Sequence, residues 1–186
     1  GAPSEACLWP EYLTTKQKGT YGYIMKLRPQ GYHEFGQYLL ARAKFKSFEA
    51  MVNAAMKICE GFKALHLSGL SYQDLNDGNF FINPQTGDVL ICDNDNVAPN
   101  GTNMGIVGKP RYMAPEIVCQ HVLPNTQTDR FSLSVILFLI LCMNHPLEGK
   151  KSLIPCLTPP EAEKLYGSEA LFICDNTNNA NEPVKN

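Results

Sequence analysis

The chain has 186 residues, a formal net charge of −2 at pH 7 and 44% hydrophobic residues. This balance predicts a globular fold with a sizeable core and argues against nucleic acid as the main partner. The seven cysteines include no C-x-x-C pair, and an odd number cannot complete a disulfide set, so we expect reduced thiols and a cytoplasmic location.

The first half of the chain predicts one strand and two helices. Residues 21–25 are aromatic and branched, as in a β-strand. Residues 33–43 read as a short helix after the turn at Gly31. Residues 47–66 form the clearest helix, because their apolar side chains recur at steps of three to four and form one stripe. Ser47 is its expected N-cap.

A hairpin, a buried helix and a polar tail follow. Residues 80–82 and 89–91 predict two short strands, joined by a turn that contains Pro and Gly. The apolar run 131–143 is shorter than the roughly 20 residues of a membrane span, so we expect a fully buried core helix and no membrane association. Residues 175–186 are Asn-rich with few apolar side chains, which predicts an extended or mobile tail.

A polar loop between the second helix and the hairpin carries candidate chemistry. Residues 72–79 read Tyr-Gln-Asp-Leu-Asn-Asp-Gly-Asn, and Asp93 follows the hairpin. An Asp beside a bound hydroxyl can orient it or accept its proton, which makes Asp74 the candidate catalytic residue. Asn79 and Asp93 are candidate metal ligands, since Mg²⁺ prefers oxygen donors. Asp and Asn are also common in turns, so a polar loop joining two strands is the alternative.

Two further motifs follow in order. Residues 108–116, Gly-Lys-Pro-Arg-Tyr-Met-Ala-Pro-Glu, resemble the G-T-P-x-Y-M-A-P-E segment that closes a protein kinase activation loop. Residues 129–137 resemble the D-x-W-S-L-G-V start of the central kinase helix. The D-x4-N loop with its later Asp resembles the catalytic and metal-binding segments of the same enzymes. Over residues 20–147 the chain is thus similar to the protein kinase superfamily, Ser/Thr-like and bacterial in character.

The resemblance implies a fold class and a domain plan. We expect a mainly α (α+β) kinase C-lobe, with helices around a central buried helix and short β-hairpins at the catalytic loop. Residues 1–28 would be an N-lobe remnant and hinge, residues 29–174 the C-lobe and residues 175–186 the tail. The 186 residues contain no glycine-rich loop and no V-A-I-K lysine strand, so we expect little or no catalysis from this fragment alone.

The implied activity is that of an ATP-dependent protein serine/threonine kinase. Such an enzyme transfers a phosphoryl group from ATP, with Mg²⁺, to a hydroxyl of a protein substrate. Met25 would be the gatekeeper, the backbone of Lys26 and Arg28 would meet the adenine edge, and Phe81 would form the floor under adenine. For Met25 and Phe81, an ordinary place in the core is the alternative.

Departures from the family pattern suggest altered control. Gln73 stands where the family has the arginine that reads a phosphorylated activation loop, so we expect no control by loop phosphorylation. The D-F-G triplet is Asp-Asn-Asp at residues 93–95, and Asn94 cannot complete the family's hydrophobic stack. Asp129 keeps its family role, in which its carboxylate accepts backbone N–H groups of the catalytic loop.

One departure suggests a compensation. The lysine that the family places two residues after Asp74 is Asn76, so a cation near the transferring phosphate is missing. Lys109 stands where the family's segment has Thr. We hypothesise that Lys109 supplies the lost charge to the γ-phosphate as a second catalytic residue; a solvated lysine without a partner is the alternative.

Two other functional classes remain open. A pseudokinase or binding module is favoured by Gln73, Asn76 and Asn94. A small-molecule phosphotransferase of the aminoglycoside or choline kinase type shares D-x4-N and the later Asp, but Ala-Pro-Glu at residues 114–116 argues for a peptide substrate. Asp-Asn-Asp-Asn together with His-Pro-Leu-Glu-Gly also resembles bacterial kinases that accompany a metal-dependent phosphatase and a von Willebrand-type protein.

Overall fold

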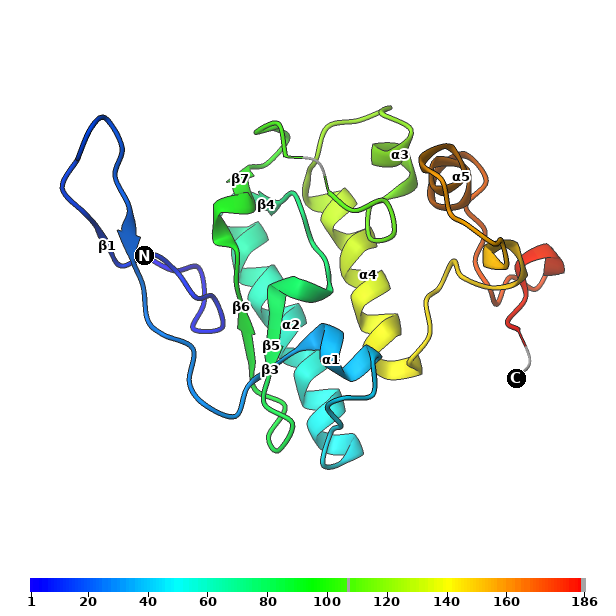
Figure 1. The fold of residues 1–186 in the computed structure, drawn as a ribbon, viewed down its shortest axis with the longest axis horizontal. Helices are drawn as coiled ribbons and strands as arrows, with labels where there is room; N and C mark the ends of the chain where they lie inside the picture. The colour runs from blue at the N-terminus through cyan, green and yellow to red at the C-terminus, as the bar shows by residue number, and fades with distance from the viewer. Residues whose placement is uncertain (107, 185–186) are drawn as a thin grey trace. The chain divides into compact units, whose positions relative to one another are not determined.

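A computed structural model describes residues 1–106 and 108–184. The chain forms two compact units, one of residues 1–70 with 77–97 and one of residues 71–76 with 98–186. Both combine helices with loops, and the strands are short (Figure 1). This mixed α/β content agrees with the predicted α+β class. Within the described ranges, no helix is long and apolar enough to cross a membrane.

The first unit is built from one long helix, one short helix and small antiparallel sheets. Strands β3, β5 and β6 form a three-stranded sheet in that order, and β1 pairs with β2. Its elements are β1 (Tyr12–Leu13), β2 (Tyr23–Ile24), β3 (His33–Glu34), α1 (Phe35–Leu39), α2 (Phe48–Leu67), β5 (Phe80–Ile82) and β6 (Val89–Ile91), with a 3₁₀ turn at Asp77–Asn79 and another at Asn94–Asn96.

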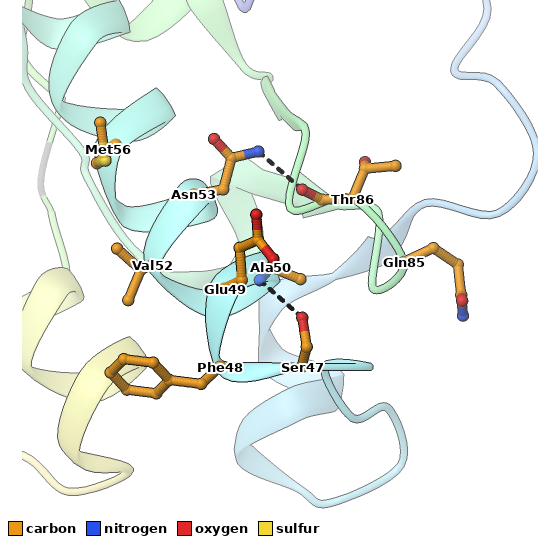
Figure 2. Close-up of a pocket in the computed structure, with 9 residues that line it drawn as sticks. All are labelled: Ser47, Phe48, Glu49, Ala50, Val52, Asn53, Met56, Gln85 and Thr86. Atoms are coloured by element: carbon orange, nitrogen blue, oxygen red, sulfur yellow. Dashed lines mark hydrogen bonds between the residues drawn. The ribbon is translucent and has the colours of Figure 1, made fainter.

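Helix α2 begins at its predicted cap and buries one face. The hydroxyl of Ser47 accepts a hydrogen bond from the Ala50 amide at 3.1 Å, which satisfies one of the free N–H groups of the first turn (Figure 2). Ile58 and Phe62 are buried, as the stripe predicted. Phe48 is 74% exposed although it was expected in the stripe, because it lies on the flank of the buried face.

The β5–β6 hairpin has its predicted bounds, and its turn packs on α2. The side chain of Asn53 donates to the Thr86 carbonyl at 2.7 Å (Figure 2). Gly87 has φ +76°, and a Cβ there would lie 2.0 Å from the Ala50 carbonyl oxygen. Only glycine fits this conformation and this approach.

The predicted helix over residues 33–43 is shorter than expected. Its first two residues, His33–Glu34, form β3, which pairs with β5 opposite Ile82 and Phe81. Helix α1 then covers Phe35–Leu39. Pairing with the sheet therefore displaces the start of the helix, an effect that local periodicity does not report.

The second unit contains the longest apolar helix, α4. Its helices, within the described residues, are α3 (Pro115–Val118), α4 (Thr126–Cys142) and α5 (Pro159–Glu163). They are accompanied by 3₁₀ turns at Lys150–Ser152 and Asn179–Asn181 and a π-helical turn at Lys164–Ser168. Strands β4 (Leu70–Tyr72) and β7 (Val97–Pro99) pair with each other, and residues 71–72 and 98–99 belong to this unit.

Helix α4 is capped at its start and buried on one side. The Asn125 side chain accepts from the Thr128 amide, and the Thr128 hydroxyl accepts from the Asn125 amide in return. Ile136 and Ile140 are fully buried, whereas Leu141 is 45% exposed. The prediction of a fully buried helix was therefore wrong. The helix carries apolar side chains on all of its sides, but only one side packs against the core.

Asn181, in the predicted tail, is anchored to this unit. The side chain of Asn181 is fully buried, donates to the carbonyls of Leu147 and Leu171, and accepts from the amides of Gly149 and Lys151. All of its hydrogen-bonding groups are thereby used. The prediction of an extended or mobile tail did not anticipate this anchor.

Candidate active site

A residue of α4 holds the loop that carries Asp74. Asp129 is 3% exposed, and its Oδ2 atom accepts a hydrogen bond of 2.7 Å from the Tyr72 amide. This confirms the expected role of Asp129 as an acceptor for the backbone of the loop. Asp74 Oδ1 is buried and, among the residues that the structure describes, has no hydrogen-bond partner. A buried carboxylate oxygen without a partner is costly, and such a cost is often found at a catalytic group, so Asp74 stays the candidate catalytic residue.

Lys109 lies against the same loop. Its ammonium donates to Asn76 Oδ1 at 3.0 Å, and Asn76 Nδ2 in turn lies 3.2 Å from the main-chain oxygen of Asp74. The Lys109 ammonium thus contacts Asn76, the residue that stands where the family has its lysine. The alternative of a lysine without a partner is wrong for this geometry.

Gln73 contacts the following loop with both ends of its amide. Its Nε2 donates to the Thr102 carbonyl at 2.6 Å, and its Oε1 accepts from the Met104 amide at 3.1 Å. The side chain is nearly buried, at 8% exposure. Gln73 therefore holds residues 102–104 by neutral hydrogen bonds.

The candidate metal ligands lie together in the first unit. Asn79 Nδ2 is 3.3 Å from Asp93 Oδ2, and Asp93 is exposed with a left-handed backbone (φ +52°). In the part of the chain that the structure describes, no three His, Cys, Asp or Glu side chains are grouped to hold a metal. An amide and one carboxylate suit Mg²⁺, which usually completes its shell with water and phosphate oxygens.

Side chains flanking Asp93 are inert or structural. Burial raises the pKa of Cys92 to about 12, so its thiol is not a nucleophile near neutral pH. The side chain of Asn94 donates to the carbonyls of Leu8 and Ile91. Asn94 therefore serves as a polar anchor for the backbone where the family has a hydrophobic stack.

The candidate adenine-binding residues are only partly brought together. The guanidinium carbon of Arg28 lies 4.3 Å from the centre of the Phe81 ring, a cation–π contact in the same unit. Lys26 instead forms an exposed ion pair with Glu11 at 3.3 Å. Met25 is half-buried. Arg28 therefore contacts Phe81 through its side chain, a contact that the sequence did not indicate.

A polar cluster in the second unit escaped the sequence analysis. Arg111 donates to both carboxylate oxygens of Glu148, at 2.6 and 2.9 Å, and the Tyr166 hydroxyl donates to Glu148 at 2.7 Å. His145 Nδ1 lies 3.9 Å from Glu148. We call Arg111, His145, Glu148 and Tyr166 the Glu148 cluster.

Electrostatics fix the charge states of the Glu148 cluster. Burial alone would raise the pKa of Glu148, but hydrogen bonds from Arg111 and Tyr166 outweigh it and leave that pKa below its ordinary value. Burial lowers the pKa of His145, against the opposing charge of Glu148. Near neutral pH the cluster therefore holds an ionised Glu148 and a neutral His145.

A cavity of about 720 Å³ lies at the start of α2, next to the hairpin turn (Figure 2). Phe48 and Met56 border it on one side and Gln85 and Thr86 on the other. None of the candidate site residues lines this cavity. The candidate catalytic and metal-binding residues therefore lie on the loops and not in this cavity.

Comparisons with known proteins match these motifs. A family model for the protein kinase domain covers residues 14–161. The chain is 28% identical over 137 residues to probable serine/threonine-protein kinase MARK-C of Dictyostelium discoideum, covering 72% of this chain and 17% of that protein. It is 31% identical over 109 residues to serine/threonine-protein kinase Sgk1 of Fundulus heteroclitus, covering 56% and 23%. Calcium-dependent protein kinase 9 of rice is 30% identical over 124 residues, covering 64% and 21%.

The chain thus spans about a fifth of the length of these relatives. All three come from eukaryotes, which gives no support to the expected bacterial character, and their names mention neither a phosphatase nor a von Willebrand-type protein. The family match includes the loop 72–79 and the segment 108–116. The chain belongs to the protein kinase domain family.

Proposed function

We propose that the protein containing this chain is an ATP-dependent serine/threonine protein kinase. Asp74 is its catalytic carboxylate, and residues 29–174 are its C-lobe, after an N-lobe remnant and hinge in residues 1–28. The observation that carries the proposal is the buried Oδ1 atom of Asp74, which has no hydrogen-bond partner in residues 1–106 and 108–184 and lies on a loop held by Asp129. A rigid backbone with one free carboxylate oxygen is what positioning a substrate hydroxyl requires.

ATP and Mg²⁺ are the proposed cofactors. Asn79 and Asp93 supply the amide and carboxylate oxygens that would hold the metal, and their 3.3 Å contact supports a shared role. Around adenine we propose Met25, Lys26, Arg28 and Phe81. Mg²⁺, when bound, neutralises charge on the transferring phosphate.

A protein substrate is supported by the surface beside Lys109. A cavity of about 560 Å³ in the same unit has a mixed polar and apolar lining, whose apolar part includes Pro110, Met113 and Ile117. Such a surface suits a peptide side chain better than a small amine or alcohol such as choline. The phosphatase and von Willebrand-type partners and the cytoplasmic location stay predictions from the sequence.

The first prediction tests the proposed function in the intact protein. Phosphoryl transfer from labelled ATP and Mg²⁺ to a library of serine- and threonine-containing peptides is expected to fall at least 100-fold in Asp74→Asn, because the group that orients the hydroxyl is lost. Asp93→Asn is expected to lose activity and to recover part of it at high Mg²⁺. Asp88→Asn is the matched control, since Asp88 is an exposed turn carboxylate.

Each other outcome selects another function. If Asp74→Asn and Asp93→Asn bind ATP and transfer phosphate no differently from the parent, the protein is a pseudokinase or binding module. If small amines or alcohols are phosphorylated and peptides are not, it is a small-molecule phosphotransferase. For the 186 residues alone we expect little or no transfer.

The second prediction tests Lys109 by exchanging two positions. Lys109→Thr is expected to lower kcat about 100-fold, the effect of removing one preorganised charge from a transfer site. Adding Asn76→Lys to that variant restores the arrangement of the family and is expected to recover most of the activity. The 3.0 Å contact between the two side chains motivates this rescue. A Lys109→Thr variant as active as the parent would remove Lys109 from the site.

A phosphorylation-independent activation loop follows from Gln73. In the family an arginine at this position reads a phosphate on the loop, as the resemblance implies. Here the amide of Gln73 is already bonded to the backbone of Thr102 and Met104. We therefore propose that the loop is held in place without phosphorylation.

A further inference from the structure

The Glu148 cluster contacts the turn from which Lys109 extends. The amides of Tyr112 and Met113 both donate to the Lys109 carbonyl, at 2.9 and 3.2 Å. These bonds close a turn over residues 109–113, so the backbone of Lys109 cannot shift independently of Arg111. Whatever holds Arg111 therefore also sets the position of Lys109.

Arg111 is held at its side chain and at its backbone. Glu148 binds its guanidinium through two parallel hydrogen bonds, the geometry that fixes an arginine most firmly. The ring of His145 lies with Nε2 2.8 Å from the Arg111 carbonyl oxygen. Because the Leu147 amide donates to Nδ1 at 3.1 Å, the proton of the neutral ring is on Nε2 and is donated to Arg111.

A substrate-reading role for Arg111 fits this geometry less well. An arginine on a peptide-binding surface could bind an acidic residue or a phosphate of the substrate. Here Glu148 uses the fork of the guanidinium, with the Glu148 side chain 24% exposed. An acidic substrate group would have to displace a carboxylate that Tyr166 also holds. The Arg111–Glu148 ion pair is therefore a structural contact within the unit and not a substrate-binding group.

We propose that Glu148 and His145 are positioning residues for the phosphoryl transfer proposed above. They fix Arg111, and through the closed turn they keep the Lys109 ammonium on Asn76, beside the backbone of Asp74. This inference rests on the proposed function and adds two residues to it that do not touch the reacting groups.

The kinetic test uses Glu148→Gln in the intact protein. This variant keeps the shape of the side chain and loses its charge, so the turn is held less firmly. With ATP, Mg²⁺ and the peptide library, kcat is expected to fall about 10- to 100-fold while KM for ATP is unchanged. Glu169→Gln is the matched control, because Glu169 forms an exposed ion pair with Lys151 at 3.3 Å and is expected to leave kcat unchanged.

A double-mutant cycle separates positioning from general support of the fold. If Glu148 acts through Lys109, Glu148→Gln in a Lys109→Thr background causes no further loss of kcat. If the two losses multiply, Glu148 acts independently of Lys109 and the proposal fails. His145→Gln is expected to behave as Glu148→Gln does in this cycle.

A measurement without catalysis distinguishes this proposal from the proposed function. Hydrogen exchange at the Tyr112 and Met113 amides is expected to be several-fold faster in Glu148→Gln and unchanged in Glu169→Gln. Unchanged exchange in both variants overturns the positioning role even if the parent is an active kinase. If exchange is faster in Glu148→Gln but the parent shows no Asp74-dependent transfer, the role of Glu148 in holding the turn is retained and the kinase function is rejected. Should Glu148→Gln fail to fold, Tyr166→Phe, which removes one hydrogen bond to Glu148, takes its place in each comparison.

Discussion

Replacing Asp129 by alanine is expected to lower the free energy of unfolding by about 3 kcal/mol, because a buried charged acceptor is lost and the Tyr72 amide is left without it. The bond between them measures 2.7 Å and both residues are buried. Chemical denaturation followed by circular dichroism measures this loss. In this variant, hydrogen exchange should be much faster at the Tyr72 amide than at the amides of α4.

Two variants of the same helix bracket this result. Asp129→Asn keeps an oxygen acceptor and is expected to lose less than half as much stability. Asn125→Ala removes the N-cap of α4, which costs about 1 kcal/mol in a typical helix, and leaves the Tyr72 bond intact. If Asp129→Ala lowered the free energy of unfolding no more than Asn125→Ala does, the Asp129–Tyr72 hydrogen bond would stabilise the fold no more than a helix cap.

The second large effect is expected at Gly87, where alanine should cost about 4 kcal/mol. A left-handed backbone penalises alanine by about 1–2 kcal/mol, and overpacking adds about 1–3 kcal/mol. The overpacking arises because a Cβ would lie 2.0 Å from the Ala50 carbonyl oxygen, so the hairpin turn would have to move off α2. Denaturant midpoints at constant slope measure the change.

Gly31 provides the matched comparison. Its φ is +85°, and nothing lies within 4 Å of the position that a Cβ would take. Gly31→Ala should therefore show the conformational cost alone, about 1 kcal/mol. Equal losses at Gly31 and Gly87 would contradict the close approach of the hairpin turn to α2.

The parts of the fold that could be predicted are those determined by neighbouring residues. Helix α2 was predicted to within a residue at each end because its apolar periodicity is long and Ser47 caps it. The β5–β6 hairpin was predicted with its bounds because branched residues flank a Pro- and Gly-containing turn. Pairing of β3 with β5 could not be predicted, since it joins His33 to Ile82 across a long stretch of chain.

The candidate site divides in the same way. The role of Asp129 followed from a motif and is confirmed by its bond to the Tyr72 amide. The contact of Lys109 with Asn76 shows that this lysine has a partner, and its role at the γ-phosphate stays a hypothesis based on two substitutions at known motif positions. Arg111 and Glu148 are 37 residues apart, and no motif or periodicity links them. Only a folded chain reveals such a pair.

The contact made by Gln73 has a consequence for regulation. Salt screens an ion pair between an arginine and a phosphate, but it barely affects hydrogen bonds from a neutral amide to backbone groups. The order of residues 102–104 should therefore be insensitive both to ionic strength and to the action of phosphatases.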